Sequence, residues 1–327
     1  MHFRLDDDQV AMRDAVRALC ADHFDLTAMA RREGEPAAPD VWSALADLGV
    51  LAMLDGDPTA GIGVMETAIV FEELGAHLAS GPVLWTTLAA SSVPGAGDGD
   101  VRVTGIEAGD GVEGPVVVEH ADESQVLVVL RGDRAEACPL ADVPRSDEGS
   151  PMDPLTPVAV LASAPSGDVV AEGAAVQRLR RNGRVLAAAS LVGGARAVLD
   201  VARDYALERE QFGVPIGSFQ AIKHMLADMY VRVEMARAAT YAAAAIAAGR
   251  GDGDPDLAAL TAKHLAGEAA VLNARAGVQV LGGMGFSWDM LPHYFLQRAF
   301  VLDLAFGTSS WHAAQLGASV GAEVAAA

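Results

Sequence analysis

The sequence predicts an α+β fold in which a small β segment separates two helical segments. Apolar residues recur at helical spacing at the start, short β-branched runs broken by Gly, Asp and Pro follow, and long alanine-rich stretches fill the rest. The 327 residues are 51% hydrophobic and 20% charged, which is enough chain for two or three domains with large cores. We therefore expect an N-terminal helical domain (residues 1–98), a small middle β domain (99–173) and a C-terminal four-helix bundle (174–327).

The N-terminal segment is expected to be helical throughout. The acidic run Asp6–Asp8 is suited to cap and charge the start of a first helix, because carboxylates there accept hydrogen bonds from free backbone N–H groups. Apolar residues follow it at helical spacing: Val10, Met12, Val16 and Leu19. The stretches VWSALADLGVLAML (41–54) and METAIVFEELGAHLA (65–79) repeat the pattern. Gly81 and Pro82 then break it.

The middle segment changes to short runs rich in β-branched residues. They read VRVTGI, GPVVVEH, SQVLVVL, VAVLASA and DVVAEG, and they begin after the turn-rich linker PGAGDGD near residue 95. Turn residues interrupt them every 8–12 residues or so, as is typical of a compact antiparallel sheet or barrel.

The C-terminal segment returns to helical periodicity with longer elements. The expected helices are residues 176–207, 218–249 and 254–281, followed by two shorter ones at 292–304 and 309–325. Alanine-rich helices joined by Gly and Asp loops are typical of a bundle in which backbones approach closely.

Charge and composition exclude several classes of function. The formal net charge is −21, which argues against binding to nucleic-acid phosphates. Arginine supplies almost all the positive charge, since only Lys223 and Lys263 are lysines. Cys20 and Cys138 match no metal or redox spacing, which suits a reducing cytoplasm. We expect no metal site and no nucleic-acid partner.

No segment predicts contact with a membrane. The stretches 185–201 and 238–249 are the most apolar, but they are shorter and less hydrophobic than the ~20 strongly apolar residues that span a bilayer. The start, MHFRLDDDQV, lacks the apolar run of a signal peptide. We expect a cytoplasmic protein.

The segment REQFG (209–213) is the first candidate for a binding site. It ends one long predicted helix, so Arg209, Gln211 and Phe212 fall together at a helix terminus. A guanidinium, an amide and an aromatic ring in one place suit a pyrophosphate with an adjacent flat ring system. The alternative is an arginine that caps helix carbonyls and a phenylalanine in the core.

The segment VQVLGGMGFSWDMLPHYFLQRA (278–299) is the second candidate. Gly282, Gly283 and Gly285 follow a predicted helix and let a backbone come close to a bulky group. Gln279, one turn earlier, offers an amide to the same place. The alternative is an ordinary helix C-cap and turn.

Together these segments resemble the C-terminal domain of the acyl-CoA dehydrogenase family. The resemblance lies in R-x-Q-F-G with downstream F-Q-A-I-K-H, followed by Q-V-L-G-G-M-G-F, and DDDQVAMRDAVRAL and VFEELGAHLASGPV are similar to the family's N-terminal helices. It implies an acyl-CoA dehydrogenase-like fold and FAD as cofactor. It also implies that six residues hold the pyrophosphate and adenine half of the FAD on a neighbouring subunit: Arg209, Gln211, Phe212, Gln279, Gly282 and Gly283.

The same resemblance shows where the chain departs from the family. The family's catalytic base is a glutamate at one of two positions, and here these hold Phe306 and Gly183, neither of which can take a proton. The β segment also lacks the family's T-E-P-like loop and its tryptophan, because all four tryptophans lie elsewhere: Trp42, Trp85, Trp288 and Trp311. No catalytic residue is therefore predicted in this chain.

This combination resembles the shorter subunits of actinobacterial heteromeric acyl-CoA dehydrogenases, which are α2β2 assemblies. Several of that group act on CoA thioesters of steroid side chains. The resemblance implies a second acyl-CoA dehydrogenase-like subunit as partner, an acyl-CoA as substrate and an electron-transfer flavoprotein as electron acceptor. Two alternatives stay open: a flavin-free scaffold that stabilises a partner, and a homomeric dehydrogenase with another base, such as Asp303 or Glu268.

Overall fold

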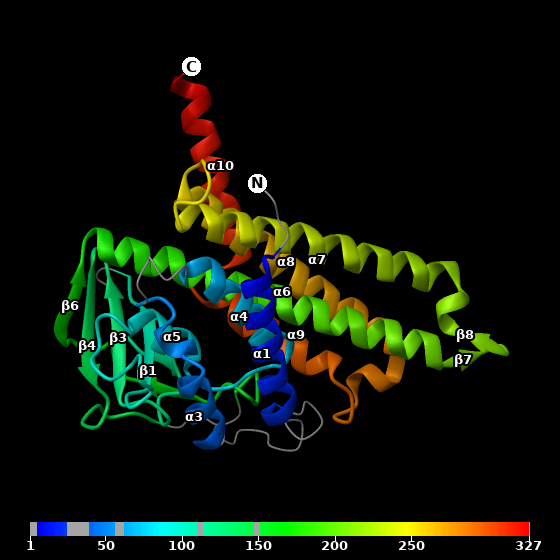
Figure 1. Ribbon diagram of the computed structural model, residues 1–327, viewed down its shortest axis with the longest axis horizontal. Coiled ribbons are helices and arrows are strands. Elements are labelled where there is room, and N and C mark those ends of the chain that lie inside the picture. The colour runs from blue at the N-terminus through cyan, green and yellow to red at the C-terminus, as the bar shows by residue number, and fades with distance from the viewer. Residues whose placement is uncertain (1–4, 25–38, 56–61, 110–113, 147–150, 327) are drawn as a thin grey trace. The chain divides into compact units, whose positions relative to one another are not determined.

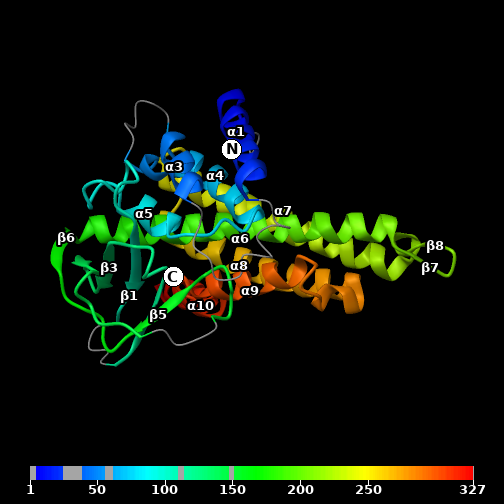
Figure 2. The same ribbon diagram turned by 90° about the horizontal axis from the view of Figure 1, so that it is seen from below.

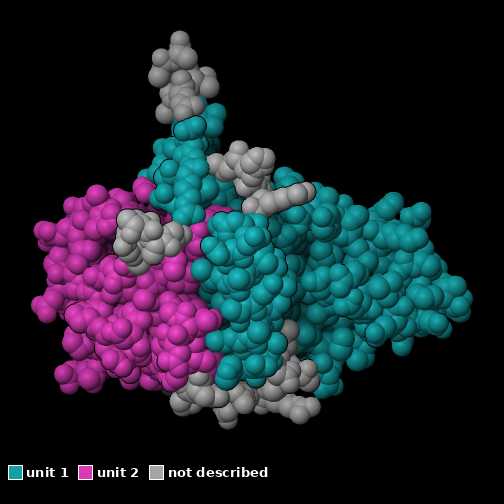
Figure 3. Space-filling model, viewed as in Figure 1, with its two compact units in different colours: residues 1–31, 68–79, 184–327 teal, residues 32–67, 80–183 magenta. Residues whose placement is uncertain are grey.

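A computed structural model describes residues 5–24, 39–55, 62–109, 114–146 and 151–326 of the chain (Figure 1). Helices come first, strands occupy the middle of the chain and long helices follow, so the predicted α+β fold is confirmed. The chain forms two compact units (Figure 3). We call residues 1–31, 68–79 and 184–327 the helical unit, and residues 32–67 and 80–183 the mixed unit. The division into three sequential domains stays a prediction.

The N-terminal helices are shorter than the periodicity predicts. Helix α1 (Asp7–His23) begins with a capping box, in which the Asp6 carboxylate accepts from the Gln9 backbone N–H at 2.8 Å. The predicted helix 41–54 divides into α3 (Pro39–Asp47) and a 3₁₀ turn, η1 (Val50–Ala52), because Gly49 between them has φ 75°. Helix α4 (Val64–Ala76) follows, and α5 (Val83–Ala89) begins after Pro82.

The mixed unit contains a four-stranded sheet of order β1-β3-β4-β6 and a separate pair, β2 and β5. The strands of the sheet are β1 (Val103–Glu107), β3 (Val126–Arg131), β4 (Arg134–Pro139) and β6 (Asp168–Glu172); those of the pair are β2 (Val116–Glu119) and β5 (Val158–Leu161). Strands β1 and β3 run parallel, which corrects the expectation of a purely antiparallel sheet. The reason is that β2 leaves the sheet to pair with β5, so the chain re-enters beside β1 in the same direction.

The helical unit consists mainly of five C-terminal helices, and their ends lie close to the predicted ones. They are α6 (Ala174–Glu208, which starts in the mixed unit), α7 (Gln220–Ala247), α8 (Pro255–Leu281), α9 (Pro292–Leu304) and α10 (Ser309–Ala326). Helix α8 packs against α7, α9 and α10. Buried Asn273 on α8 donates to Ala195 O on α6 (3.3 Å) and to Met229 O on α7 (3.0 Å), which fixes α8 against both helices.

Helix α4 packs closely on α6 through two glycines. A Cβ atom at Gly193 would lie 1.9 Å from Glu72 O, and one at Gly75 would lie 2.1 Å from Ser190 O. Only glycine permits this approach, so helix α4 is held directly against the C-terminal bundle within the helical unit.

Helix α6 is long and apolar enough to cross a membrane by length and composition. However, 61% of its most apolar window is buried inside the protein, as in the core helix of a bundle.

Candidate functional site

The segment that contains Arg209 forms a tight hairpin between α6 and α7. Strands β7 (Glu210–Gln211) and β8 (Val214–Pro215) pair across a two-residue loop, Phe212-Gly213. Both loop residues have positive φ, 56° and 78°, as in type I′ hairpins. Asn or Gly usually occupies the first of these positions, and a bulky aromatic residue there is strained.

The Phe212 side chain is 95% exposed and touches the Phe219 ring edge-on, with 6.2 Å between the ring centroids. The alternative of a phenylalanine in the core is therefore wrong. A strained backbone that presents an apolar ring to solvent is typical of a site completed by a ligand or a partner.

Arg209 is exposed at the base of the same hairpin. Its backbone N–H donates to Tyr205 O at 2.8 Å, and its carbonyl accepts from Ile216 N at 2.7 Å. Within the described ranges no acceptor lies within hydrogen-bond distance of its guanidinium, so it does not cap the carbonyls of α6. Gln211 is also exposed, and its amide donates to Glu210 O at 2.7 Å.

The glycine-rich segment forms a 3₁₀ turn, η4 (Gly282–Phe286), directly after α8. Gly282 has φ 62°, and a Cβ at Gly282 or Gly283 would meet nothing within 4 Å in the chain. Gly285, in contrast, is buried. A Cβ atom added at this position would lie 2.6 Å from Val278 O, so the glycine allows close packing within the chain. Gln279 is exposed on the last turn of α8.

The two segments lie toward the same end of the helical unit. Ala195 and Val198 of α6 lie beside Asn273 and Gly277 of α8, so these two helices run parallel. The C-terminal ends of α6 and α8 therefore point the same way, and Figures 1 and 2 show the β7–β8 hairpin and the α8–α9 turn in this arrangement. All six predicted cofactor residues are exposed there: Arg209, Gln211, Phe212, Gln279, Gly282 and Gly283.

The two positions where the family carries its base hold no carboxylate in this structure. Gly183 lies within α6, and Phe306 lies in the α9–α10 loop with φ 57° and a side chain that is 4% exposed. Fully buried Lys263 holds this loop, because its Nζ atom donates to Asp303 O (3.0 Å) and Gly307 O (3.2 Å). Burial lowers the pKa of Lys263 to about 8, although the charge of Asp303 opposes the shift.

Neither alternative base is well placed. The Asp303 carboxylate accepts hydrogen bonds from the Ser309 N–H (3.1 Å) and from the Ser309 hydroxyl, so it caps the start of α10. The Glu268 side chain is 56% exposed and lies 3.9 Å from His264 Nε2. Both carboxylates serve surface or helix-end contacts.

A buried histidine beside this loop was not predicted from the sequence. His312 is fully buried in α10, and its ring lies against the backbone of Gly307. Burial, followed by the charges of Lys263 and Arg184, lowers its pKa to about 3. His312 is therefore neutral at physiological pH.

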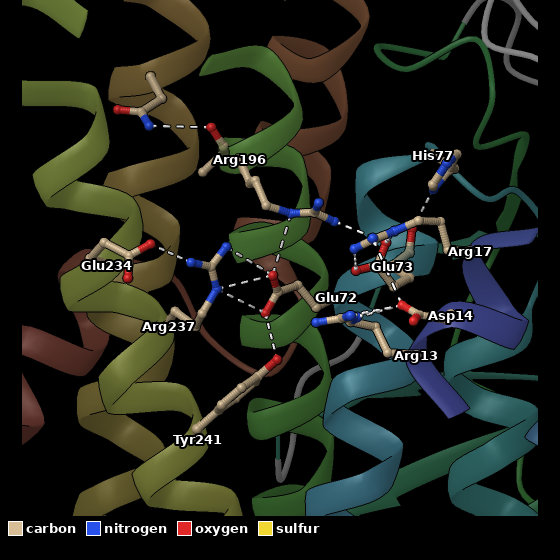
Figure 4. Close-up of polar contacts among 12 residues, drawn as sticks. Arg13, Asp14, Arg17, Glu72, Glu73, His77, Arg196, Glu234, Arg237 and Tyr241 are labelled. Atoms are coloured by element: carbon tan, nitrogen blue, oxygen red, sulfur yellow. Dashed lines mark hydrogen bonds and ion pairs between the residues drawn. The ribbon is translucent and has the colours of Figure 1, made fainter. Parts of the chain in front are cut away.

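A buried ion-pair network joins four helices of the helical unit (Figure 4). Glu73 of α4 contacts Arg17 of α1 (2.9 Å) and Arg196 of α6 (3.0 Å). Glu72 contacts Arg237 of α7 at 3.0 Å and accepts from the Tyr241 hydroxyl at 2.9 Å. The sequence signal for this network is the pair of adjacent glutamates within the apolar run VFEELGA.

The charge states in this network follow from burial and pairing. Burial alone would raise the pKa of the Glu73 carboxyl, but the Arg17 hydrogen bond and the charge of Arg196 lower it overall. Burial and the neighbouring Glu72 raise the pKa of Tyr241. The Glu73 carboxylate is therefore ionised at neutral pH, and Tyr241 acts as a neutral donor.

Models of two domains of one family match the chain. The acyl-CoA dehydrogenase N-terminal domain matches residues 6–98, and the acyl-CoA dehydrogenase C-terminal domain matches residues 173–321. The chain belongs to the acyl-CoA dehydrogenase family.

Two curated members of the acyl-CoA dehydrogenase family from Mycobacterium tuberculosis are similar in sequence. FadE34 is 33% identical across 90% of this chain, and the chain spans about half of that protein's length (45%). IpdE2 is 29% identical across 90% of this chain and 91% of its own length.

Solved acyl-CoA dehydrogenase structures share the fold. A variant of the Tcur3481–Tcur3483 steroid acyl-CoA dehydrogenase is 25% identical, with a TM-score of 0.82 over 98% of this chain and 99% of the other. The ChsE4–ChsE5 complex from Mycobacterium tuberculosis contains a chain that is 22% identical, with a TM-score of 0.83 over 98% and 99% of the two chains.

The exposed end of the helical unit carries groups of the kind that one half of a dinucleotide requires. Arg209 has guanidinium donors with no acceptor among the described residues, Phe212 offers an exposed ring for a flat base, and the open surface at Gly282 and Gly283 permits close approach. The two family base positions do not fit a catalytic base, because neither Phe306 nor Gly183 can take a proton, and Asp303 beside Phe306 caps α10.

Proposed function

We propose that this chain is one subunit of a heteromeric FAD-dependent acyl-CoA dehydrogenase, which desaturates an acyl-CoA between its α and β carbons. This chain supplies the cross-interface half of the FAD site, and a partner subunit supplies the catalytic base. The observation that carries the proposal is the outward position of Arg209 and Phe212: the guanidinium has no acceptor in the described chain, and the ring is 95% exposed.

In this proposal the chain's own residues bind and orient the cofactor. Arg209 would hold the pyrophosphate through charge-assisted hydrogen bonds, and Phe212 would contact the adenine half. Gln211 and Gln279 offer amide groups, and the bare backbone at Gly282 and Gly283 lets the cofactor approach. The chemistry that FAD supplies when bound is acceptance of the β-hydrogen as a hydride.

We expect the α-proton to go to a carboxylate outside this chain. Phe306 and Gly183 have no proton acceptor, and the Asp303 carboxylate accepts hydrogen bonds from Ser309 at the start of α10. A homomeric enzyme that uses Asp303 would have to break this cap first. The partner subunit therefore provides the base in our proposal.

Similarity to proteins named as two-chain acyl-CoA dehydrogenases supports an α2β2 assembly. Similarity to the Tcur3481–Tcur3483 steroid acyl-CoA dehydrogenase supports a CoA thioester of a steroid side chain as the substrate class. An electron-transfer flavoprotein as acceptor and a location in the cytoplasm complete the proposal.

The proposal is tested by co-expression with the acyl-CoA dehydrogenase-like subunit encoded by a neighbouring gene. We expect a yellow complex with roughly one FAD per heterodimer, whereas the chain purified alone is colourless and inactive. A colourless complex would instead support the scaffold alternative. A yellow, active homo-oligomer of this chain alone would support the homomeric alternative.

A further inference from the structure

Phe219 lies at the start of α7, and its ring meets the exposed ring of Phe212 at the tip of the β7–β8 hairpin. The ring centroids are 6.2 Å apart and the ring planes are at 90° to each other. This T-shaped geometry is one of the arrangements that the charge distribution of aromatic rings favours. The contact therefore joins the tip of the hairpin to the first turn of the next helix.

The backbone of Phe219 is fixed at this point. Phe219 is the N-cap residue of α7, with φ −75° and ψ 135°. Its N–H donates to Ile216 O at 3.1 Å, and its carbonyl accepts from the Lys223 N–H at 3.1 Å. Both backbone groups of Phe219 are thus used by the turn before α7 and by the first turn of α7.

The turn before α7 is in turn held against the end of α6. It is a 3₁₀ turn, η3 (Ile216–Ser218), and the Ile216 N–H donates to Arg209 O at 2.7 Å. A Cβ atom added at Gly217 would lie 2.9 Å from Ala206 O, so the turn lies directly on the backbone of α6. These contacts fix Phe219 relative to Arg209 without involving the tip of the hairpin.

The Phe212 side chain has far less support of its own. It is 95% exposed, and Phe219 is the one aromatic residue in ring contact with it among those described. The contact restrains the Phe212 ring and leaves almost all of its surface free for a ligand. A side chain that is ordered before binding loses less conformational entropy on binding, so such a restraint raises affinity.

The Phe219 ring is the less available of the two for a ligand. Its side chain is 38% exposed, so the chain itself covers most of its surface, whereas the Phe212 side chain is almost uncovered. This difference favours a supporting role for Phe219 and a direct role for Phe212.

We propose that Phe219 is a positioning residue, which holds the Phe212 ring in the orientation in which that ring contacts the adenine half of FAD. The inference rests on the function proposed above, in which Phe212 contacts the cofactor. It has a specific consequence: Phe219 contributes to FAD affinity through Phe212, and the contribution disappears when the Phe212 ring is removed.

The test is a double-mutant cycle in the co-expressed complex, made of Phe219→Leu, Phe212→Ala and the two combined. Leucine keeps apolar bulk at position 219 without a ring, and Phe219→Tyr is the conservative variant that keeps the ring. Phe300→Leu is the matched control, since this partly buried residue of α9 lies under Arg275, 5.8 Å from its guanidinium carbon. Flavin titration gives the dissociation constant of FAD, and thermal unfolding gives the melting temperature of each variant.

We expect Phe219→Leu to raise the dissociation constant of FAD roughly three- to tenfold, which corresponds to the loss of one aromatic pair. Phe219→Tyr and Phe300→Leu should stay within twofold of the wild type. In the Phe212→Ala background, Phe219→Leu should change the dissociation constant less than twofold. Phe219→Met is a second change without a ring, in case Phe219→Leu does not assemble.

Two outcomes overturn the inference. One is an unchanged dissociation constant for Phe219→Leu while Phe212→Ala weakens binding. The other is a loss of equal size with and without the Phe212 ring, because Phe219 would then act on the cofactor or on the fold independently of Phe212. If the wild-type complex binds no FAD, or if Phe212→Ala leaves its affinity unchanged, the function proposed above fails instead, so the two failures are distinguishable.

Discussion

Lys263 lies under the loop that contains Phe306, and its Nζ atom donates to the carbonyls on both sides of that residue, Asp303 O at 3.0 Å and Gly307 O at 3.2 Å. The lysine is fully buried, and the loop it holds has a phenylalanine at φ 57°. The loop is thus fixed by internal contacts, even though no base is present at its centre.

Removal of this lysine should destabilise the chain and change its response to alkaline pH. The folded-state pKa of Lys263 is about 8, below its ordinary 10.5, so between these values the unfolded chain binds more protons and stability rises with pH. Lys263→Met should lower the free energy of unfolding by about 1–3 kcal/mol at pH 7, because two partly buried carbonyls lose their donor. In the same variant the free energy of unfolding, measured by urea unfolding, should rise less with pH between 8 and 10.5. A variant that keeps the wild-type slope would show that other groups cause it.

Acid should destabilise the protein through His312. Its folded-state pKa is about 3 against an ordinary 6.5, so as pH falls through this window the unfolded chain takes up a proton that the folded chain refuses. His312→Phe should reduce the loss of stability between pH 6.5 and 3, because phenylalanine takes up no proton in the folded or the unfolded chain. His224→Phe, at an exposed position, is the control and should leave the acid transition unchanged.

Loss of the Glu72 carboxylate should destabilise the protein more than loss of the Tyr241 hydroxyl. Glu72→Gln leaves Arg237 without its buried counter-ion, and loss of one partner of a buried pair costs about 3–5 kcal/mol. Tyr241→Phe removes one hydrogen bond and should cost about 1 kcal/mol. Chemical denaturation of both variants checks the order. Equal effects would mean that the charges contribute little.

Substitution of Arg209 should lower the FAD content of the complex and leave the fold unchanged. A charge-assisted hydrogen bond is worth ~1.5–3 kcal/mol, so Arg209→Ala should weaken FAD binding by the assembled complex roughly ten- to a hundredfold. Arg209→Lys should recover part of the loss, because a lysine cannot form two parallel bonds. FAD occupancy and melting temperature are measured on the same samples. Full occupancy with a lower melting temperature would contradict the cofactor role.

Phe212 should show opposite effects on stability and on flavin binding. Phe212→Asn creates the Asn-Gly pair that a loop with two positive φ values prefers, which should stabilise the isolated chain by about 1 kcal/mol. The same change removes the exposed ring, so the complex should bind FAD more weakly. Thermal unfolding of the chain and flavin titration of the complex give the two values. A simultaneous gain in both would remove the reason for an aromatic residue at this position.

Much of the fold could be predicted because its elements are long and periodic. The C-terminal helices have uninterrupted apolar faces, and the structure ends them close to the predicted residues. Strand β4 was missed, because RAEACP contains two charges and a proline and lacks clear alternation. Its place in the sheet depends on pairing with β3, which no local pattern reveals.

Some features of the candidate site could also be predicted from the sequence, and others could not. The grouping of Arg209 and Gln279 at one end of the helical unit follows from helix lengths and can be read from the sequence. The pairing of Glu72 with Arg237 joins residues 165 positions apart and cannot be predicted from a local pattern. The same holds for the burial of His312, since a histidine next to a tryptophan at a helix start is equally compatible with an exposed surface.

The bare Phe212 ring has a consequence for how the isolated chain behaves in a cell. Unless a ligand or another chain covers this ring, it stays in water, where exposed apolar surface favours aggregation and capture by chaperones and proteases. In a heteromeric assembly of the kind proposed above, balanced synthesis of the two subunits would avoid this cost.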